Sequence, residues 1–66
     1  MEIRINGKQK SVPDHLSLKG LLDHLELQQG GLAVEVNGKI VRRQDHEDWD
    51  IRENDSLEIV HLIGGG

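Results

Sequence analysis

The chain has 66 residues, contains no cysteine and carries a formal net charge of −4. A chain of this length forms one domain, and the lack of cysteine excludes disulfide bonds, thiolate metal ligands, a cysteine nucleophile and a persulfide carrier. The negative charge argues against a nucleic-acid partner, whose phosphates require basic patches, and is compatible with docking on a basic protein surface. No apolar run approaches the ~20 residues of a membrane span and no signal peptide opens the chain, so we expect a cytoplasmic protein without a membrane partner.

The N-terminal part of the sequence predicts a β-hairpin. Residues 2–5 alternate between polar and apolar side chains, as in a half-buried strand. Asn6-Gly7 follows, and this pair favours a two-residue turn because both positions tolerate positive φ. Residues 8–12 form the return strand, whose lysines suit an exposed edge of a sheet.

A helix is predicted to begin after Ser17, which is a favourable N-cap residue. Four leucines then fall at i, i+3, i+4 and i+7 and so share one helix face: Leu18, Leu21, Leu22 and Leu25. Gly20 weakens this helix. We expect the helix to end near Gln28, with Gly30 or Gly31 as its C-terminal glycine.

The second half of the sequence predicts three further strands. Residues 32–37 alternate between apolar and other side chains, and Asn37-Gly38 turns the chain into a short return strand. Residues 42–53 are charged and irregular, with Trp49 as an expected plug of the small core. The last strand covers residues 57–62. One helix can cover one face of the resulting four- to five-stranded sheet, which predicts an α+β two-layer sandwich.

The sequence ends in Gly64-Gly65-Gly66, and we expect residues 1–62 to form the domain and residues 63–66 to form a flexible tail. A terminal glycine arm places a carboxylate where no side chain hinders its entry into a narrow channel. Because a terminal glycine has no stereocentre, activation of its carboxylate cannot racemise it. The tail therefore fits a carboxylate that another enzyme activates and loads; a frayed or truncated end is the alternative.

Four stretches of the chain together resemble a known family. They are Met1 to Lys8, Val34 to Val41 with Arg43 following, Asn54-Asp55 before the last strand, and Ile63 to Gly66. In this order they are similar to the ThiS sulfur carriers of thiamin (thiazole) biosynthesis. The resemblance implies a β-grasp, ubiquitin-like fold with the first and last strands parallel at the sheet centre. It also implies that Gly66 is adenylated by an E1-like partner (ThiF), is converted to a thiocarboxylate and delivers sulfur to thiazole synthase (ThiG).

The expected functional residues lie at the end of the chain. Gly66 is the acyl group, and Ile63, Gly64 and Gly65 enter the channel of the partner. Val60 and Leu62 face away from the helix and form a candidate docking patch, unless they are ordinary scattered surface aliphatics. No catalytic residue, metal or bound cofactor is expected, because the chain has no Walker-type phosphate loop and no catalytic base near its end; ATP is used by the activating partner.

The remaining polar residues are expected to be structural or solvated. The spacing of the four histidines matches no zinc pattern. The acidic stretch at residues 45–55 is either a solvated loop or a surface that steers a basic partner. Three other functions remain open: a molybdopterin-type sulfur carrier, a ubiquitin-like protein modifier and a plain interaction domain with an inert tail. The free protein is expected to be a monomer.

Overall fold

The computed structural model describes residues 1–27 and 30–61. In chain order its elements are β1 (Glu2–Ile5), β2 (Lys8–Ser11), α1 (Leu18–His24), β3 (Leu32–Val36), β4 (Lys39–Val41), the 3₁₀ helix η1 (Arg43–Asp48) and β5 (Ser56–His61). Within the described ranges no helix is long and apolar enough to cross a membrane.

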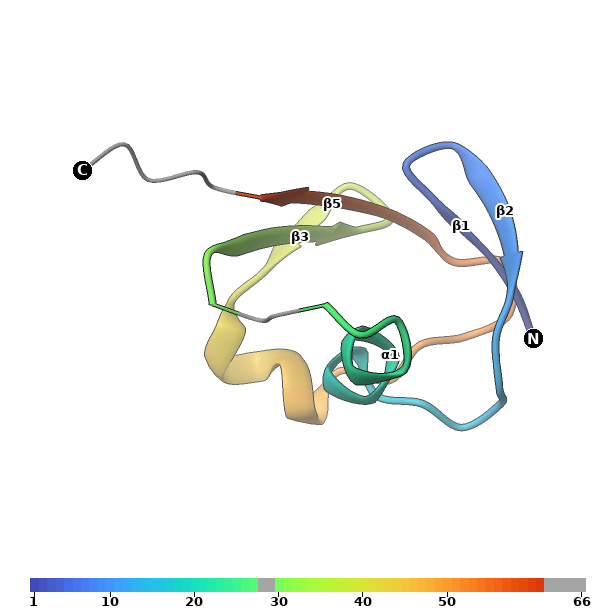
Figure 1. Cartoon of the computed structure of the whole chain (residues 1–66), viewed down its shortest axis with the longest axis horizontal. Coiled ribbons are helices and arrows are strands. Elements are labelled where there is room, and N and C mark those ends of the chain that lie inside the picture. The colour runs from blue at the N-terminus through green and yellow to red at the C-terminus, as the bar shows by residue number, and fades with distance from the viewer. Residues whose placement is uncertain (28–29, 62–66) are drawn as a thin grey trace.

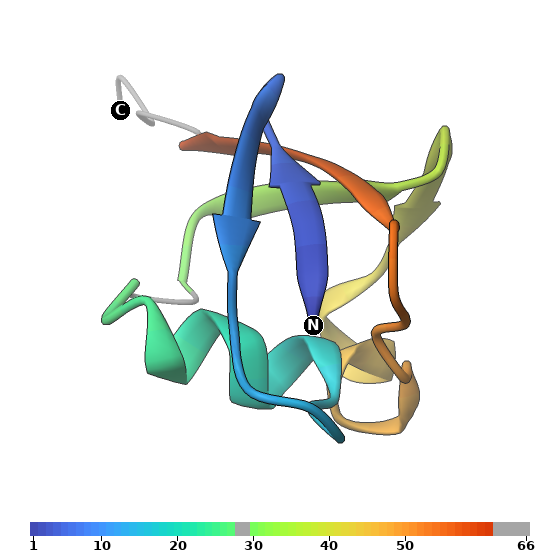
Figure 2. The same cartoon turned by 90° about the vertical axis from the view of Figure 1, so that its right-hand side faces the viewer.

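The strands form one mixed five-stranded sheet with the order β2-β1-β5-β3-β4 (Figure 1). The last strand, β5, lies at the centre, parallel to β1 and antiparallel to β3. The lysine-rich β2 lies at one edge, as its composition predicts. Both α1 and η1 lie on the same side of the sheet (Figures 1 and 2). The predicted α+β architecture, with one α-helix on one face of the sheet, is confirmed.

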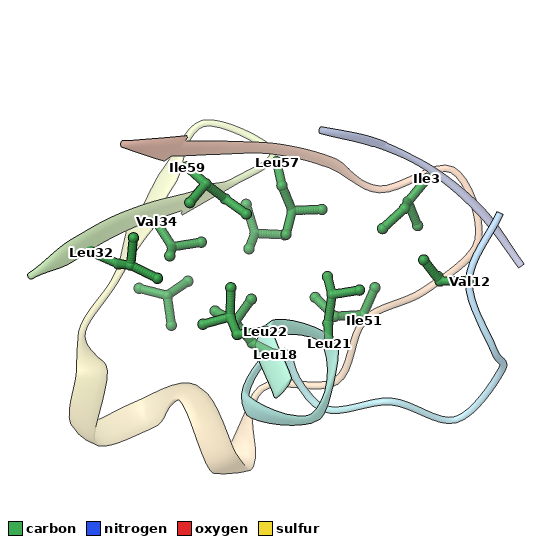
Figure 3. Close-up of a cluster of buried hydrophobic side chains, with 12 residues drawn as sticks. Ile3, Val12, Leu18, Leu21, Leu22, Leu32, Val34, Ile51, Leu57 and Ile59 are labelled. Atoms are coloured by element: carbon green, nitrogen blue, oxygen red, sulfur yellow. The ribbon is translucent and has the colours of Figure 1, made fainter. Parts of the chain in front are cut away.

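The core lies between α1 and the sheet (Figure 3). Leu18, Leu21 and Leu22 are completely buried, while Leu25 is only partly buried at the end of the helix. Burying a leucine side chain contributes about 1.5–3 kcal/mol, so this helix face supplies a large share of the apolar stabilisation. From the sheet, the side chains with the least exposure are Ile3, Val34, Val36 and Leu57.

The helix begins as predicted and ends earlier than predicted. The hydroxyl of Ser17 accepts a hydrogen bond from the backbone N–H of Gly20 at 3.0 Å. At the other end, Glu26 adopts a φ of 59° and donates its N–H to Asp23 O, while Leu27 donates to Leu22 O. This is a Schellman motif with glutamate, rather than glycine, at the left-handed position. The expected end near Gln28 is therefore wrong: the chain leaves the helix four residues earlier, at His24.

The segment after β4 is more ordered than its composition indicates. Residues 43–48 form η1, where an irregular loop was expected. Beyond η1, Leu18 donates its N–H to Trp49 O at 2.7 Å, and Ile51 donates to Leu16 O at 2.9 Å. These bonds attach the segment to the start of α1. Trp49 is half-buried and packs against the core, in keeping with its expected role as a plug.

Gly20 offers a simple test of the helix. A Cβ atom there would lie 3.4 Å from Ser17 Oγ and 3.5 Å from Leu16 Cδ2, which are ordinary contact distances. We therefore expect Gly20→Ala to raise the free energy of unfolding by about 0.5–1 kcal/mol, because alanine restricts the unfolded chain and favours the helix. Urea denaturation measures this difference. Gly7→Ala is the matched control: it should be destabilising, since Gly7 has a φ of 83°. An unchanged or lowered stability of Gly20→Ala would refute the described helix geometry.

Candidate functional site

The candidate site begins on β5, the strand that leads into the predicted tail. Leu57 and Ile59 point into the core and are buried, whereas Glu58 and Val60 are exposed. Val60 has an exposed fraction of 55% and, because it alternates with the buried Leu57 and Ile59, lies on the sheet face away from the core. The other predicted site residues lie outside the described residues, and their roles stay predictions: Leu62, Ile63, Gly64, Gly65 and Gly66.

The side chain of Asn6 holds the middle of β5. Ile59 donates its N–H to Asn6 Oδ1 at 2.8 Å, and Asn6 Nδ2 donates to Ile59 O at 3.1 Å. Asn6 itself has a φ of 52° in the turn between β1 and β2. One side-chain amide therefore satisfies both the backbone N–H and the backbone C=O of Ile59, at the point where β1 ends and no longer pairs with β5.

Asn37, in the turn between β3 and β4, holds the start of β5 in a similar way. Its Oδ1 accepts a hydrogen bond from Ser56 N at 2.9 Å, and its backbone N–H donates to Ser56 O at 2.7 Å. Its Nδ2 donates to the carboxylate of Asp55 at 2.9 Å. The two Asn-Gly turns thus hold β5 from both neighbouring hairpins. Sequence reasoning assigned these asparagines only a turn-forming role; the available signal was that an amide offers both a donor and an acceptor.

The importance of the Asn6 amide can be measured with Asn6→Gly, which keeps a residue suited to positive φ. We expect the free energy of unfolding to fall by about 1–2 kcal/mol, because two hydrogen bonds to Ile59 are lost and the relief of strain offsets only part of that loss. Asn54→Gly is the control: Asn54 also has positive φ, at 69°, but its side chain makes no hydrogen bond within the described residues. It should be neutral or stabilising. Equal stability of the two variants in urea denaturation would contradict the role of Asn6.

The open face of the sheet combines aliphatic and acidic side chains. In the register of the sheet, Glu58 of β5 lies opposite Glu35 of β3, and Glu35 lies opposite Ile40 of β4. Val60 lies opposite Ala33. Among the described residues two large hydrophobic side chains are exposed, Ile40 and Val60, and Ile40 has the higher exposed fraction, 76%. The predicted patch at Val60 is therefore part of a broader surface.

The histidines do not converge on a site. His46 is buried, and its Nε2 lies 3.1 Å from Val41 O. Because a carbonyl oxygen only accepts, Nε2 carries the proton, and Nδ1 has no hydrogen-bond partner within the described residues. His15, His24 and His61 are exposed. Across residues 1–27 and 30–61, no three His, Asp or Glu side chains lie close enough together to hold a metal ion.

Some carboxylates of the acidic stretch accept hydrogen bonds from the backbone, and others are exposed to solvent. Glu53 accepts a hydrogen bond from the backbone N–H of Glu2 at 3.0 Å, and Asp55 accepts one from Arg52 N at 2.7 Å. These two carboxylates help to fix the loop that leads into β5. Asp45, Glu47 and Asp48 are exposed on η1, which lies on the helix side of the sheet, away from the open face.

The parallel pairing of β1 with a central β5, and a single α-helix across one face of the sheet, define a β-grasp protein of the ubiquitin-like class. The chain belongs to the ThiS family, whose family model matches residues 3–66. The crystal structure of the thiamine biosynthesis protein ThiS from Geobacter metallireducens superimposes with a TM-score of 0.86 at 29% identity, covering 100% of both chains.

Two kinds of curated relatives are similar to this chain. The sulfur carrier protein ThiS of Bacillus subtilis is 31% identical over 65 residues, which cover 97% of this chain and 98% of that protein. The thiazole synthase of Magnetococcus marinus is 36% identical over 66 residues, which are the whole of this chain but 20% of that protein. The chain thus spans about a fifth of the length of that thiazole synthase. The family is one of small sulfur carriers of thiamine biosynthesis rather than of catalysts.

Proposed function

We propose that the C-terminal carboxylate of Gly66 carries sulfur as a thiocarboxylate for thiazole formation. A carboxylate is unreactive towards sulfur nucleophiles at neutral pH, so it must first acquire a leaving group. An E1-like enzyme of the ThiF type supplies one: the carboxylate attacks the α-phosphate of ATP, pyrophosphate leaves, and an acyl-adenylate forms. A sulfur nucleophile then attacks the acyl carbon and AMP leaves.

The single observation that carries this proposal is the family match, which includes the glycine tail up to Gly66. The structure adds a scaffold for delivery, since β5 is the central strand and is held by both neighbouring strands and by two asparagine side chains. From Val60 to Gly66 an extended chain spans at most ~25 Å. An enzyme that acts on the Gly66 carboxylate must therefore bind close to this end of the sheet.

The proposed acceptor of the sulfur is a thiazole synthase of the ThiG type. In the thiazole synthase of Magnetococcus marinus, a stretch similar to this whole chain accounts for 20% of the protein. A similar stretch accounts for 20% of the thiazole synthase of Paramagnetospirillum magneticum, at 33% identity. When a carrier-like stretch and a synthase are fused in one chain in some organisms, a direct interaction between the separate carrier and synthase proteins is favoured in others.

The other residues of the site have supporting roles in this proposal. Ile63, Gly64 and Gly65 pass through the channel of the activating enzyme, where the two glycines, which have no side chain, permit a close approach. Val60 and Leu62 contact the enzyme outside that channel. The carrier acts as a cytoplasmic monomer and binds no cofactor of its own, because ATP belongs to the activating enzyme.

The experiment that tests the proposal is ATP–pyrophosphate exchange with a purified ThiF-type enzyme. We expect the exchange to depend on this chain and to saturate with its concentration. Absence of exchange, with an enzyme shown to be active on the Bacillus subtilis ThiS, would refute adenylation of this chain.

A further inference from the structure

Two carboxylates face each other at the centre of the open sheet face. Glu58 of β5 and Glu35 of β3 are direct cross-strand partners, and like charges in this arrangement are destabilising. Neither carboxylate has a hydrogen-bond or ion-pair partner within the described residues. Arg4 of β1 lies opposite Ser56, and it forms no ion pair with either glutamate. The free protein therefore retains an uncompensated pair of negative charges on this face.

Exposed aliphatic side chains flank this pair on both sides. Ile40 of β4 is the cross-strand partner of Glu35 and is 76% exposed. Val60 lies two residues after Glu58, on the same side of β5, and is 55% exposed. Ala33 lies opposite Val60. Exposed apolar side chains bordered by polar ones are typical of a protein interaction surface. This surface, Ala33, Glu35, Ile40, Glu58 and Val60, is continuous with the strand that leads to the tail.

We propose that this surface receives an arginine of the adenylating enzyme, with the guanidinium placed between Glu35 and Glu58. A guanidinium is planar and has five donors, so it can bond to both carboxylates at once, which a lysine ammonium does less well. Its aliphatic stem then packs on Ile40 and Val60. The inference rests on the proposed adenylation and adds the chemistry by which the enzyme recognises the carrier.

This arrangement predicts opposite effects of one substitution on the free and the bound carrier. Glu35→Gln or Glu58→Gln removes the repulsion, so the free protein should melt at the same or a higher temperature. The same changes remove a charge-assisted contact, so the enzyme should bind the carrier less tightly. A merely structural role of these glutamates would not separate stability from binding in this way.

The test is ATP–pyrophosphate exchange with the ThiF-type enzyme, measured against carrier concentration and salt. For the Glu35→Gln/Glu58→Gln double variant we expect a KM at least about tenfold higher, a similar kcat because the tail is intact, and a weaker dependence of KM on salt. Glu47→Gln/Asp48→Asn is the matched control, because both carboxylates are exposed on η1 and their loss removes the same two charges from the helix side. Its KM should be unchanged.

The outcomes separate this inference from the proposed function. Absence of exchange by the unmodified carrier would overturn adenylation itself. Normal exchange by the carrier together with an unchanged KM of the double variant would overturn only the glutamate contact. An equal rise of KM in Glu47→Gln/Asp48→Asn would show that net charge alone matters and would also overturn it. If the double variant is adenylated normally but transfers sulfur poorly to thiazole synthase, the surface belongs to the synthase and the proposed occupant is wrong.

Discussion

Replacement of Gly65 by valine is expected to abolish adenylation while leaving the fold intact. The branched side chain would enter the part of the channel nearest the reactive carboxylate, where only glycines pass, and valine also restricts the backbone conformations available to the tail. Extension of the chain by one alanine after Gly66 should have the same effect, because it moves the reactive carboxylate past the α-phosphate of ATP. Pyrophosphate exchange measures the loss, and circular dichroism checks the fold.

The control for these tail variants is His61→Ala. His61 is exposed at the end of β5, so this change alters a side chain next to the tail without altering the core. Its exchange rate should stay close to that of the unmodified chain if no histidine takes part in the chemistry. Normal exchange by the extended variant would refute the assignment of Gly66 as the acyl group.

The largest effect on stability is expected for Leu21→Ala. Leu21 is completely buried between α1 and the sheet, and loss of its side chain leaves a cavity (Figure 3). Such substitutions cost about 2–5 kcal/mol. At about 0.05–0.15 kcal/mol per residue, a domain of this length has roughly 3–10 kcal/mol in total, so the variant is expected to be close to unfolding.

Urea denaturation of Leu21→Ala and Leu25→Ala gives a matched comparison. Leu25 lies on the same helix face but is only partly buried, so the same truncation should cost clearly less. Equal losses for the two variants would contradict the described packing of the helix on the sheet.

The order and faces of most elements could be predicted because their patterns are local. The alternation around Val34 and the Asn-Gly pairs fixed strands and turns, and the hydroxyl of Ser17 marked the start of the helix. The end of the helix was missed because the decisive residue, Glu26, adopts a conformation that usually belongs to glycine. The glutamate side chain gives no indication of this conformation. Leu27, which follows the turn, packs partly buried against the core, and this tertiary contact cannot be read from the local sequence.

Features that depend on strand register could not be predicted from local patterns. The sequence indicates that Glu58 and Glu35 face away from the core, but only the pairing of β5 with β3 brings them opposite each other. The contact of the Asn6 amide with Ile59 likewise joins residues far apart in the sequence. The burial of His46 depends on how η1 folds against the rest of the domain, which its charged sequence does not reveal.

The central claim is tested most directly by the intact mass of the chain purified from cells that also express its native partners. We expect a mass increase equal to the difference between one sulfur and one oxygen atom, located by fragmentation at Gly66. The increase should disappear when the adenylating enzyme is omitted. An unmodified mass in the presence of partners that load the Bacillus subtilis ThiS, or a modification at any residue other than Gly66, would contradict the account.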